Sequence, residues 1–139
     1  MTDIREIIQI FLTSQMLCVV STVNADGTPE SALVAFSESS DLEITIGTFN
    51  DTRKFANILR NPHVACVIGT TDQTLQLEGI ARIANDEEID HCRIQHTQKN
   101  PASAKYVHDP KQRFVIVKPT WLRYTDYGTD PDTVEERSF

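Results

Sequence analysis

The sequence is poor in cysteine and has no long apolar segment, and both absences exclude classes of protein. Its three cysteines are widely spaced and include no Cys-x-x-Cys pair, which favours a reducing cytoplasm over a disulfide-stabilised secreted scaffold. No apolar run approaches the roughly 18 residues that a transmembrane helix needs. The acidic, amphipathic opening Met1–Glu6 is unlike a signal peptide. We therefore expect a cytoplasmic protein that does not engage a membrane.

Positive charge is also scarce. Lys and Arg number 13 against 20 Asp and Glu, so the formal net charge is −7. Nucleic-acid binding and docking on anionic membranes both require a basic face, and we expect neither. An anionic ligand would have to be held by a local cluster of cations.

The residues that are present are typical of a soluble globular protein, with 40% apolar and 24% charged side chains. A chain of this size favours one domain, over residues 1–139, that needs no disulfide or metal to stabilise it. Apolar residues at helical spacing predict an N-terminal helix within residues 1–14, and a strand follows over Met16–Val23. An Asp-Gly pair at 26–27 predicts a hairpin turn to a second strand over Pro29–Phe36.

The remaining segments alternate between strand and helix signals. In chain order they are a strand over Leu42–Gly47, a short helix capped by Asn50 or Asp51 and ended by Asn61-Pro62, strands over His63–Thr70 and Thr74–Ile83, a long helix capped by Asn85 or Asp86 and running toward Lys99, an ambiguous stretch at 102–112 with a short helix ending near Val107, strands over Phe114–Lys118 and Trp121–Tyr124 hinged at Pro119, and a loose polar tail at 128–139. Short links imply mainly antiparallel pairing. The pattern predicts a mainly β fold, a closed antiparallel β-barrel with peripheral helices at its rim.

The segment Thr48–Lys54 is where we expect ligand chemistry. It leaves a strand, turns and opens a helix, and helix starts present unpaired N–H groups that bind phosphate. Thr48 and Thr52 add hydroxyl donors, while Arg53 can form two parallel hydrogen bonds to a phosphate and Lys54 adds a point charge. The alternative is that Asp51 caps the helix and the two cations are a solvated surface pair.

Two strands carry weaker patterns. The polar face of Thr74, Gln76 and Glu78 either lines a cleft or meets solvent. Trp121 and Arg123 share a face, which either borders a flat ring or lies in a dimer interface.

Cys92 and His96 lie four residues apart on the predicted long helix, but two ligands do not make a metal site, and we expect no metal. The histidines at 63 and 108 are isolated. No glycine-rich nucleotide loop, nucleophile elbow or zinc-protease motif is present, so no catalytic nucleophile can be named.

One stretch carries a known pattern: Gly47-Thr48 … Thr52-Arg53-Lys54-Phe55-Ala56-Asn57-Ile58 … Asn61-Pro62-His63-Val64. In order and spacing it resembles the signature of the pyridoxamine 5′-phosphate oxidase-like, FMN-binding split-barrel family. The upstream Asp-Gly-Thr-Pro hairpin, the downstream Leu-Glu-Gly at 77–79 and a late strand with Trp also fit. The resemblance spans roughly residues 16–125.

This resemblance implies an antiparallel split β-barrel that forms a homodimer, with two FMN sites at the subunit interface. Thr52, Arg53 and Lys54 would hold the FMN phosphate, with Thr48 nearby. The second strand around Ala32–Val34, including Leu33 and Val34, would run along the flavin ring largely through its backbone. Gln76 and Trp121, from the other subunit, would close the site.

The sequence departs from the family's namesake oxidase at the residues that help it to recognise pyridoxine. Ala32 and Ser37 lie near the positions of an Arg and a Lys on its second strand, and its Gln before the Glu-Gly pair would fall at Thr74. Its closing Arg-Leu-x-Pro is missing, since this chain ends Glu-Arg-Ser-Phe. Vitamin B6 oxidation is therefore not expected.

Our leading hypothesis is a dimeric FMN-dependent oxidoreductase that acts on an unknown small molecule without an essential side-chain acid or base. One alternative is a non-catalytic module that binds or senses a flavin, a deazaflavin or haem. Another is a barrel that binds nothing and serves as an interaction domain.

Overall fold

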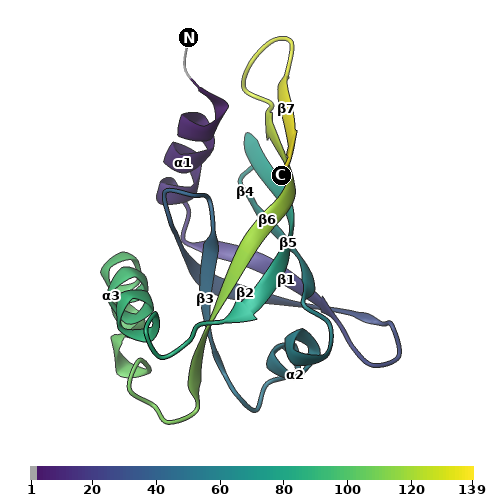
Figure 1. The fold of residues 1–139 in the computed structure, drawn as a ribbon. Coiled ribbons are helices and arrows are strands. Elements are labelled where there is room, and N and C mark those ends of the chain that lie inside the picture. The colour runs from purple at the N-terminus through teal and green to yellow at the C-terminus, as the bar shows by residue number, and fades with distance from the viewer. Residues whose placement is uncertain (1–2) are drawn as a thin grey trace.

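Six antiparallel strands close into a barrel in a computed structural model that describes residues 3–139 (Figure 1). The strands are β1 (Leu17–Val23), β2 (Pro29–Glu38), β3 (Ile44–Phe49), β4 (His63–Gly69), β5 (Gln73–Ile83), β6 (Gln112–Asp126) and β7 (Thr133–Ser138). They pair in the order β3-β2-β1-β4-β5-β6-β7, and β6 also pairs with β3, which closes the ring. The predicted fold class, a mainly antiparallel barrel of the split-barrel type, is confirmed.

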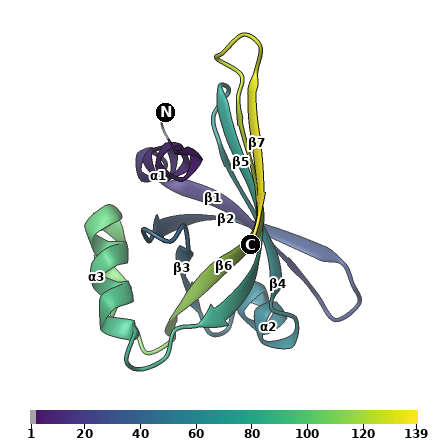
Figure 2. The same cartoon turned by 45° about the horizontal axis from the view of Figure 1, so that its top comes forward.

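In the described residues, three α-helices lie around the barrel (Figure 2), and one 3₁₀-helix follows the last of them. They are α1 (Ile4–Ser14), α2 (Arg53–Arg60), α3 (Ile89–Lys99) and η1 (Pro101–Lys105). The predicted N-terminal helix begins at Ile4, where the Asp3 side chain accepts a hydrogen bond from the Arg5 N–H, and residues 1–2 lie outside the described part of the chain. None of the described helices is long and apolar enough to cross a membrane.

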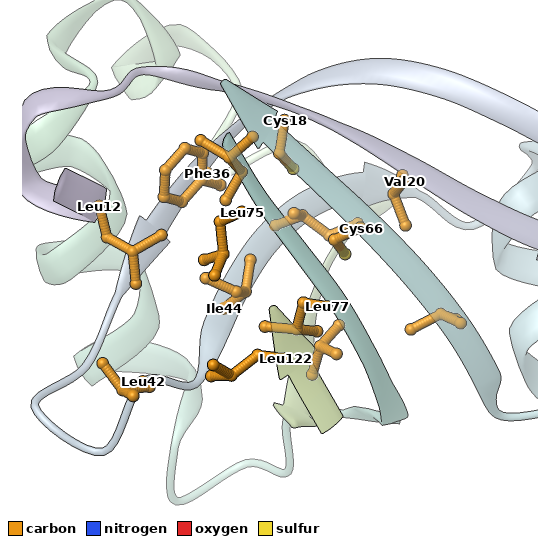
Figure 3. Close-up of a cluster of buried hydrophobic side chains, with 14 of the residues drawn as sticks. Leu12, Cys18, Val20, Phe36, Leu42, Ile44, Cys66, Leu75, Leu77 and Leu122 are labelled. Atoms are coloured by element: carbon orange, nitrogen blue, oxygen red, sulfur yellow. The ribbon is translucent and has the colours of Figure 1, made fainter. Parts of the chain in front are cut away.

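The core fills the inside of the barrel because alternate residues of each strand point inward (Figure 3). β4 alternates strictly between exposed and buried residues, and Cys66 on its inner face lies near Cys18 of β1. The apolar stripe of α1 adds to this core, with Phe11 packed edge-on against Tyr124 of β6. Leu12 of the same stripe is fully buried.

The barrel opens between β2 and β3. These strands pair only where Phe36–Glu38 meet Ile44–Ile46, whereas β3 pairs with β6 along its whole length, from Ile44 to Phe49. The stretch of β2 from Pro29 to Ala35 pairs with β1 on one edge, while its other edge has no strand beside it in the described chain. This unpaired edge faces the side of the barrel where the Thr48–Lys54 segment lies.

Two predictions for the last part of the chain were wrong. The two strands predicted around Pro119 are one continuous strand, β6. A bulge in its pairing with β5 lies where Pro119 is opposite Gly79, and a proline, which has no N–H to donate, is tolerated at such an irregularity. The tail predicted to be loose forms β7, which pairs with residues Trp121–Asp126 of β6. Backbone pairing does not depend on apolar side chains, so the polar tail gave no strand signal.

Two element starts also differ from the prediction. β3 begins at Ile44, because Leu42 adopts a left-handed backbone with φ of 64° in the preceding turn, although its side chain is buried. α3 begins at Ile89, after a turn in which the Asn85 and Glu88 side chains each accept a hydrogen bond from the other residue's N–H.

Candidate functional site

The start of α2 is organised by Thr52, which lies at its N-cap. The Thr52 hydroxyl accepts a hydrogen bond from the Phe55 N–H and lies 2.9 Å from the hydroxyl of Thr48, which is buried at the end of β3. The predicted cap, Asn50 or Asp51, was wrong. The Asp51 carboxylate turns away to an ion pair with Lys111, 3.0 Å long, which also lowers the pKa of that carboxyl.

The two cations that follow Thr52 differ in their surroundings. Arg53 is largely exposed and forms a 3.0 Å ion pair with Glu30 of β2. Glu30 also accepts a hydrogen bond of 2.8 Å from Asn57, and this bond, more than Arg53, lowers the pKa of its carboxyl. Lys54 is half-buried and makes no ion pair within residues 3–139. Burial lowers its pKa, which marks an ammonium that lacks an anion.

Two hollows meet at Thr52 and Lys54. The smaller cavity, of about 210 Å³, lies between the start of α2 and β2 and is lined by Glu30, Ala32 and Arg53 among others. The larger cavity, of about 570 Å³, lies between the ends of β3 and α3 and reaches Ala35 of β2. The four predicted residues Thr48, Thr52, Arg53 and Lys54 therefore lie together beside open space.

Leu33 and Val34 lie on β2 between the residues that border the two cavities. The Leu33 side chain is exposed, and neither side chain lines a cavity. Phe36 donates its N–H to Met16 of the segment before β1, so the antiparallel alternation turns the backbone groups of Leu33 away from β1. Leu33 thus presents its backbone, rather than its side chain, toward the unpaired edge of β2.

Gln76 and Trp121 lie apart from this group. Gln76 is exposed on the outer face of β5, opposite Val67 of β4 and Arg123 of β6. Trp121 is half-buried on β6, in the part that pairs with β7. Neither residue lines the two cavities in one subunit. The prediction that they act from a second subunit stays a prediction.

Cys92 and His96 are both buried on α3 but line different spaces. Cys92 lines a separate hollow beside Arg82 and Glu88, whereas His96 lines the larger cavity. Burial raises the pKa of the Cys92 thiol. Within residues 3–139 no group of three metal-binding side chains comes together.

Sequence reasoning missed several residues of the larger cavity, chiefly His96, Lys105 and Tyr106. The imidazole of His96 packs edge-on against Phe114, and its Nδ1 lies 3.4 Å from the Ser37 hydroxyl. Burial, reinforced by Lys99, lowers its pKa and favours the neutral form. A buried polar residue in the helix, where an apolar one would be expected, was the available signal.

One family model matches most of this chain, and several solved structures share its fold. The family model described as pyridoxamine 5′-phosphate oxidase matches residues 4–126. No curated protein matches the sequence. Among solved structures, a haem-binding protein from Mycobacterium smegmatis has a TM-score of 0.86 at 14% identity; the match covers 99% of this chain, which spans only 59% of that protein.

Two further solved structures match along nearly the whole of both chains. General Stress Protein 26 from Bacillus anthracis str. Sterne has a TM-score of 0.77 at 22% identity, covering 99% of this chain and 100% of its own. A pyridoxamine 5′-phosphate oxidase-related, FMN-binding protein from Nostoc punctiforme has a TM-score of 0.72 at 12% identity, covering 100% and 97%. At these identities the structural matches show a shared fold, and the haem and the FMN named for two of these proteins are said of those proteins alone.

Proposed function

This chain belongs to the pyridoxamine 5′-phosphate oxidase family, and from that we propose that it binds FMN along the unpaired edge of β2 and uses it in the oxidation or reduction of a small molecule. The observation that carries the proposal is Lys54, a half-buried ammonium without an anionic partner in the described chain, beside the paired hydroxyls of Thr48 and Thr52. A phosphate would relieve the desolvation of this cation and accept hydrogen bonds from both hydroxyls.

The residues present fit the phosphate end of FMN. α2 has no acidic residue in its first turn, so no carboxylate there repels a phosphate dianion from the free N–H groups and the two cations. Arg53 can reach the phosphate by leaving Glu30, since both line the smaller cavity with Lys54. Asp51 does not interfere, because its carboxylate is held by Lys111.

The ring end would lie along β2. The backbone N–H and C=O of Leu33 point toward its unpaired edge, where they can meet the polar edge of a flat ring. Ala32 and Ala35 bring only small side chains to the adjoining cavities, so a ring can approach the backbone. When bound, FMN would supply reversible hydride transfer, and the chain would hold and orient it.

We also propose that the protein acts as a homodimer. Val19, Leu33 and Val67 are exposed and lie in one row across β2, β1 and β4, and Gln76 continues the row on β5. An apolar row of this kind on a sheet face is typical of an interface between identical subunits. A two-fold contact through it would bring the partner's Gln76 face against this subunit, as the family resemblance implies for Gln76 and Trp121.

A charge introduced into the apolar row tests the dimer. Val67→Glu places a carboxylate in the row without touching the core, so light scattering should report a monomer and FMN affinity should fall. Thr71→Glu, a change of similar polarity in the exposed β4–β5 turn, is the control and should stay dimeric. A monomeric unchanged protein would contradict this part of the proposal.

The decisive experiment for FMN is mass spectrometry of the ligand released from the purified protein, followed by FMN titration of the stripped chain. Arg53→Ala combined with Lys54→Ala should lose at least about 100-fold in affinity, because two charge-assisted contacts are removed. Arg5→Ala combined with Lys118→Ala removes two exposed cations elsewhere and should bind normally. Equal FMN affinity in both double variants would refute the phosphate assignment.

A haem-binding module is the second candidate, and the imidazole of His96 in the larger cavity favours it. Haem titration should then give a Soret band that His96→Ala shifts. A yellow protein that NADH or NADPH bleaches supports the oxidoreductase instead. The three cysteines are free and buried, which supports a reducing, cytoplasmic setting for either function.

A further inference from the structure

We propose that the larger cavity binds the substrate, and that this substrate is a small aromatic carboxylate whose acid group is held by Lys105. The inference rests on the proposed flavin function, because FMN would occupy Lys54 and the edge of β2 and leave the rest of this cavity free. Three properties of the cavity support it: its charge, its flat apolar walls and the His96 imidazole on its inner wall.

The charge of the cavity is opposite to that of the chain. The protein carries 20 acidic residues, yet none of the described residues that line this cavity is Asp or Glu. Lys54 and Lys105 both line it, and neither forms an ion pair within residues 3–139. A ligand with negative charge is therefore favoured over a neutral or cationic one of the same shape.

The walls suit a flat ring. Phe49 and Tyr106 meet edge to face with their ring centroids 5.8 Å apart, and both line the cavity. Met16, Ala35, Pro101 and Ala102 add apolar surface. The Lys105 ammonium lies 5.0 Å from the centroid of Tyr106, so a ring that packs on Tyr106 brings its acid group next to Lys105.

A single lysine favours a carboxylate over a phosphate at this end. The cavity residues near Lys105 include no arginine, and the five-residue η1 is too short to act as a phosphate-binding helix start. The proposed FMN phosphate would meanwhile neutralise Lys54. What remains is one exposed point charge, which matches one monoanion.

His96 supplies a polar contact on the inner wall. Its Nδ1 faces Ser37, whereas its Nε2 has no hydrogen-bond partner in the described chain and lies on the side of Gly47 and Gln112. A Cβ on Gly47 would lie 3.8 Å from this Nε2 and 2.4 Å from the Gln112 amide nitrogen. The glycine therefore leaves room for the Gln112 side chain beside the imidazole, and the neutral imidazole can hydrogen-bond to a ring substituent.

The test uses 2-naphthoate and its neutral isostere 2-naphthamide as probes, with binding to the full-length, FMN-loaded protein followed by calorimetry. Naphthoate should bind about tenfold more tightly than naphthamide, as expected for one charge-assisted contact. Lys105→Gln should abolish this preference without changing FMN affinity, and Tyr106→Ala should weaken both probes. Lys118→Gln, an exposed lysine outside the cavity, is the matched control.

Three results would overturn the inference: equal affinity for the two probes, an unchanged preference in Lys105→Gln, or tighter binding of 2-naphthyl phosphate than of naphthoate. The FMN titration of the same samples separates the two proposals. A protein that binds FMN but shows no naphthoate preference refutes the substrate class alone. A protein that binds no FMN refutes the proposed function, whatever the probes do.

Discussion

Two regions of the barrel differ in how completely their strands pair. One is the wall formed by β4, β5 and β6, and the other is the opening between β2 and β3. Along the wall, β5 pairs with β6 from Gln73 to Ile83, and only one bulge interrupts the ladder. At the opening, β2 and β3 share a pairing of three residues and then separate. The wall satisfies its backbone internally, whereas the opening leaves backbone groups of β2 and the Lys54 ammonium without internal partners in the described chain.

The turns that lead into α3 and α2 repeat this difference. The turn that links β5 of the wall to α3 carries Glu88, which pairs with Arg82 of β5 and accepts a hydrogen bond from the Asn85 N–H. α2, next to the opening, begins with Arg53 and Lys54 and has no acidic residue in its first turn. Cations at a helix start oppose the helix dipole, which costs about 0.3–1 kcal/mol each. The two cations at the start of α2 therefore lower the stability of the ligand-free protein, and the proposed anionic ligand would offset this cost.

Matched glycine substitutions should distinguish the wall from the opening most clearly. A Cβ on Gly79, in the wall, would lie 2.6 Å from the carbonyl oxygen of Lys118, so Gly79→Ala should lower the free energy of unfolding by about 3 kcal/mol. Gly47→Ala, at the opening, meets the flexible end of Gln112, which can move, so its loss should stay below about 1 kcal/mol. Urea unfolding of both variants measures this, and equal losses would show that the two regions are equally rigid.

Removing the unpartnered cation should separate binding from stability. Lys54→Gln should weaken FMN binding about 10- to 100-fold, as expected for one charge-assisted contact. Because burial lowers the pKa of Lys54, its charged form is disfavoured in the folded ligand-free protein, so the free energy of unfolding should not fall at pH 7. FMN titration and urea unfolding check this, with Lys118→Gln as control. A marked loss of stability would assign Lys54 a structural role.

The acidic partner beside the wall should behave in the opposite way. Glu88→Gln breaks the pair with Arg82 and should lower the free energy of unfolding by about 1 kcal/mol, with FMN affinity unchanged. Arg82 lowers the pKa of Glu88 to about 2, so its contribution is present above the ordinary value near 4.5 and is lost as the pH falls toward 2. Unfolding measured from pH 6 to pH 2 should therefore show a shallower decline in Glu88→Gln than in the unchanged protein.

The smallest expected effect concerns His96. Its lowered pKa means that the unfolded chain binds a proton more readily than the folded one, so stability should decline as the pH falls below about 6.5. His96→Asn should reduce this decline between pH 7 and pH 5.5 by a fraction of a kilocalorie per mole. Thermal unfolding across this range measures it.

Features that depend on residues close together in the chain could be predicted from the sequence. The alternation of Leu75, Leu77 and Ala81 predicted β5, and the Asp-Gly turn predicted the β1–β2 hairpin, where Gly27 adopts a φ of 83°. Thr48 to Lys54 could be singled out as one group because these residues are neighbours in the chain. The structure keeps them together beside open space.

What the sequence could not predict depends on residues far apart in the chain. Thr52, rather than Asp51, is the N-cap of α2, and the Asp51 carboxylate instead pairs with Lys111, which is distant in the sequence. His96 and Tyr106 reach the larger cavity only because the segment from α3 to just past η1 packs beside β3. No local pattern encodes such packing. β7 could not be predicted either, because it forms by pairing with an edge of β6 that only the three-dimensional structure shows to be free.

That edge of β6 has a mechanical consequence. β3 pairs with it up to Val117, and the chain end returns to it at Thr120, which accepts the Phe139 N–H before β7 pairs from Trp121 onward. β3 and β7 thus pair with successive stretches of the same edge of β6. A shift of β3 by a few residues toward Thr120 would bring it against β7. β7 therefore occupies the stretch of β6 that β3 would need in a shifted register, which favours the register in which β3 is observed.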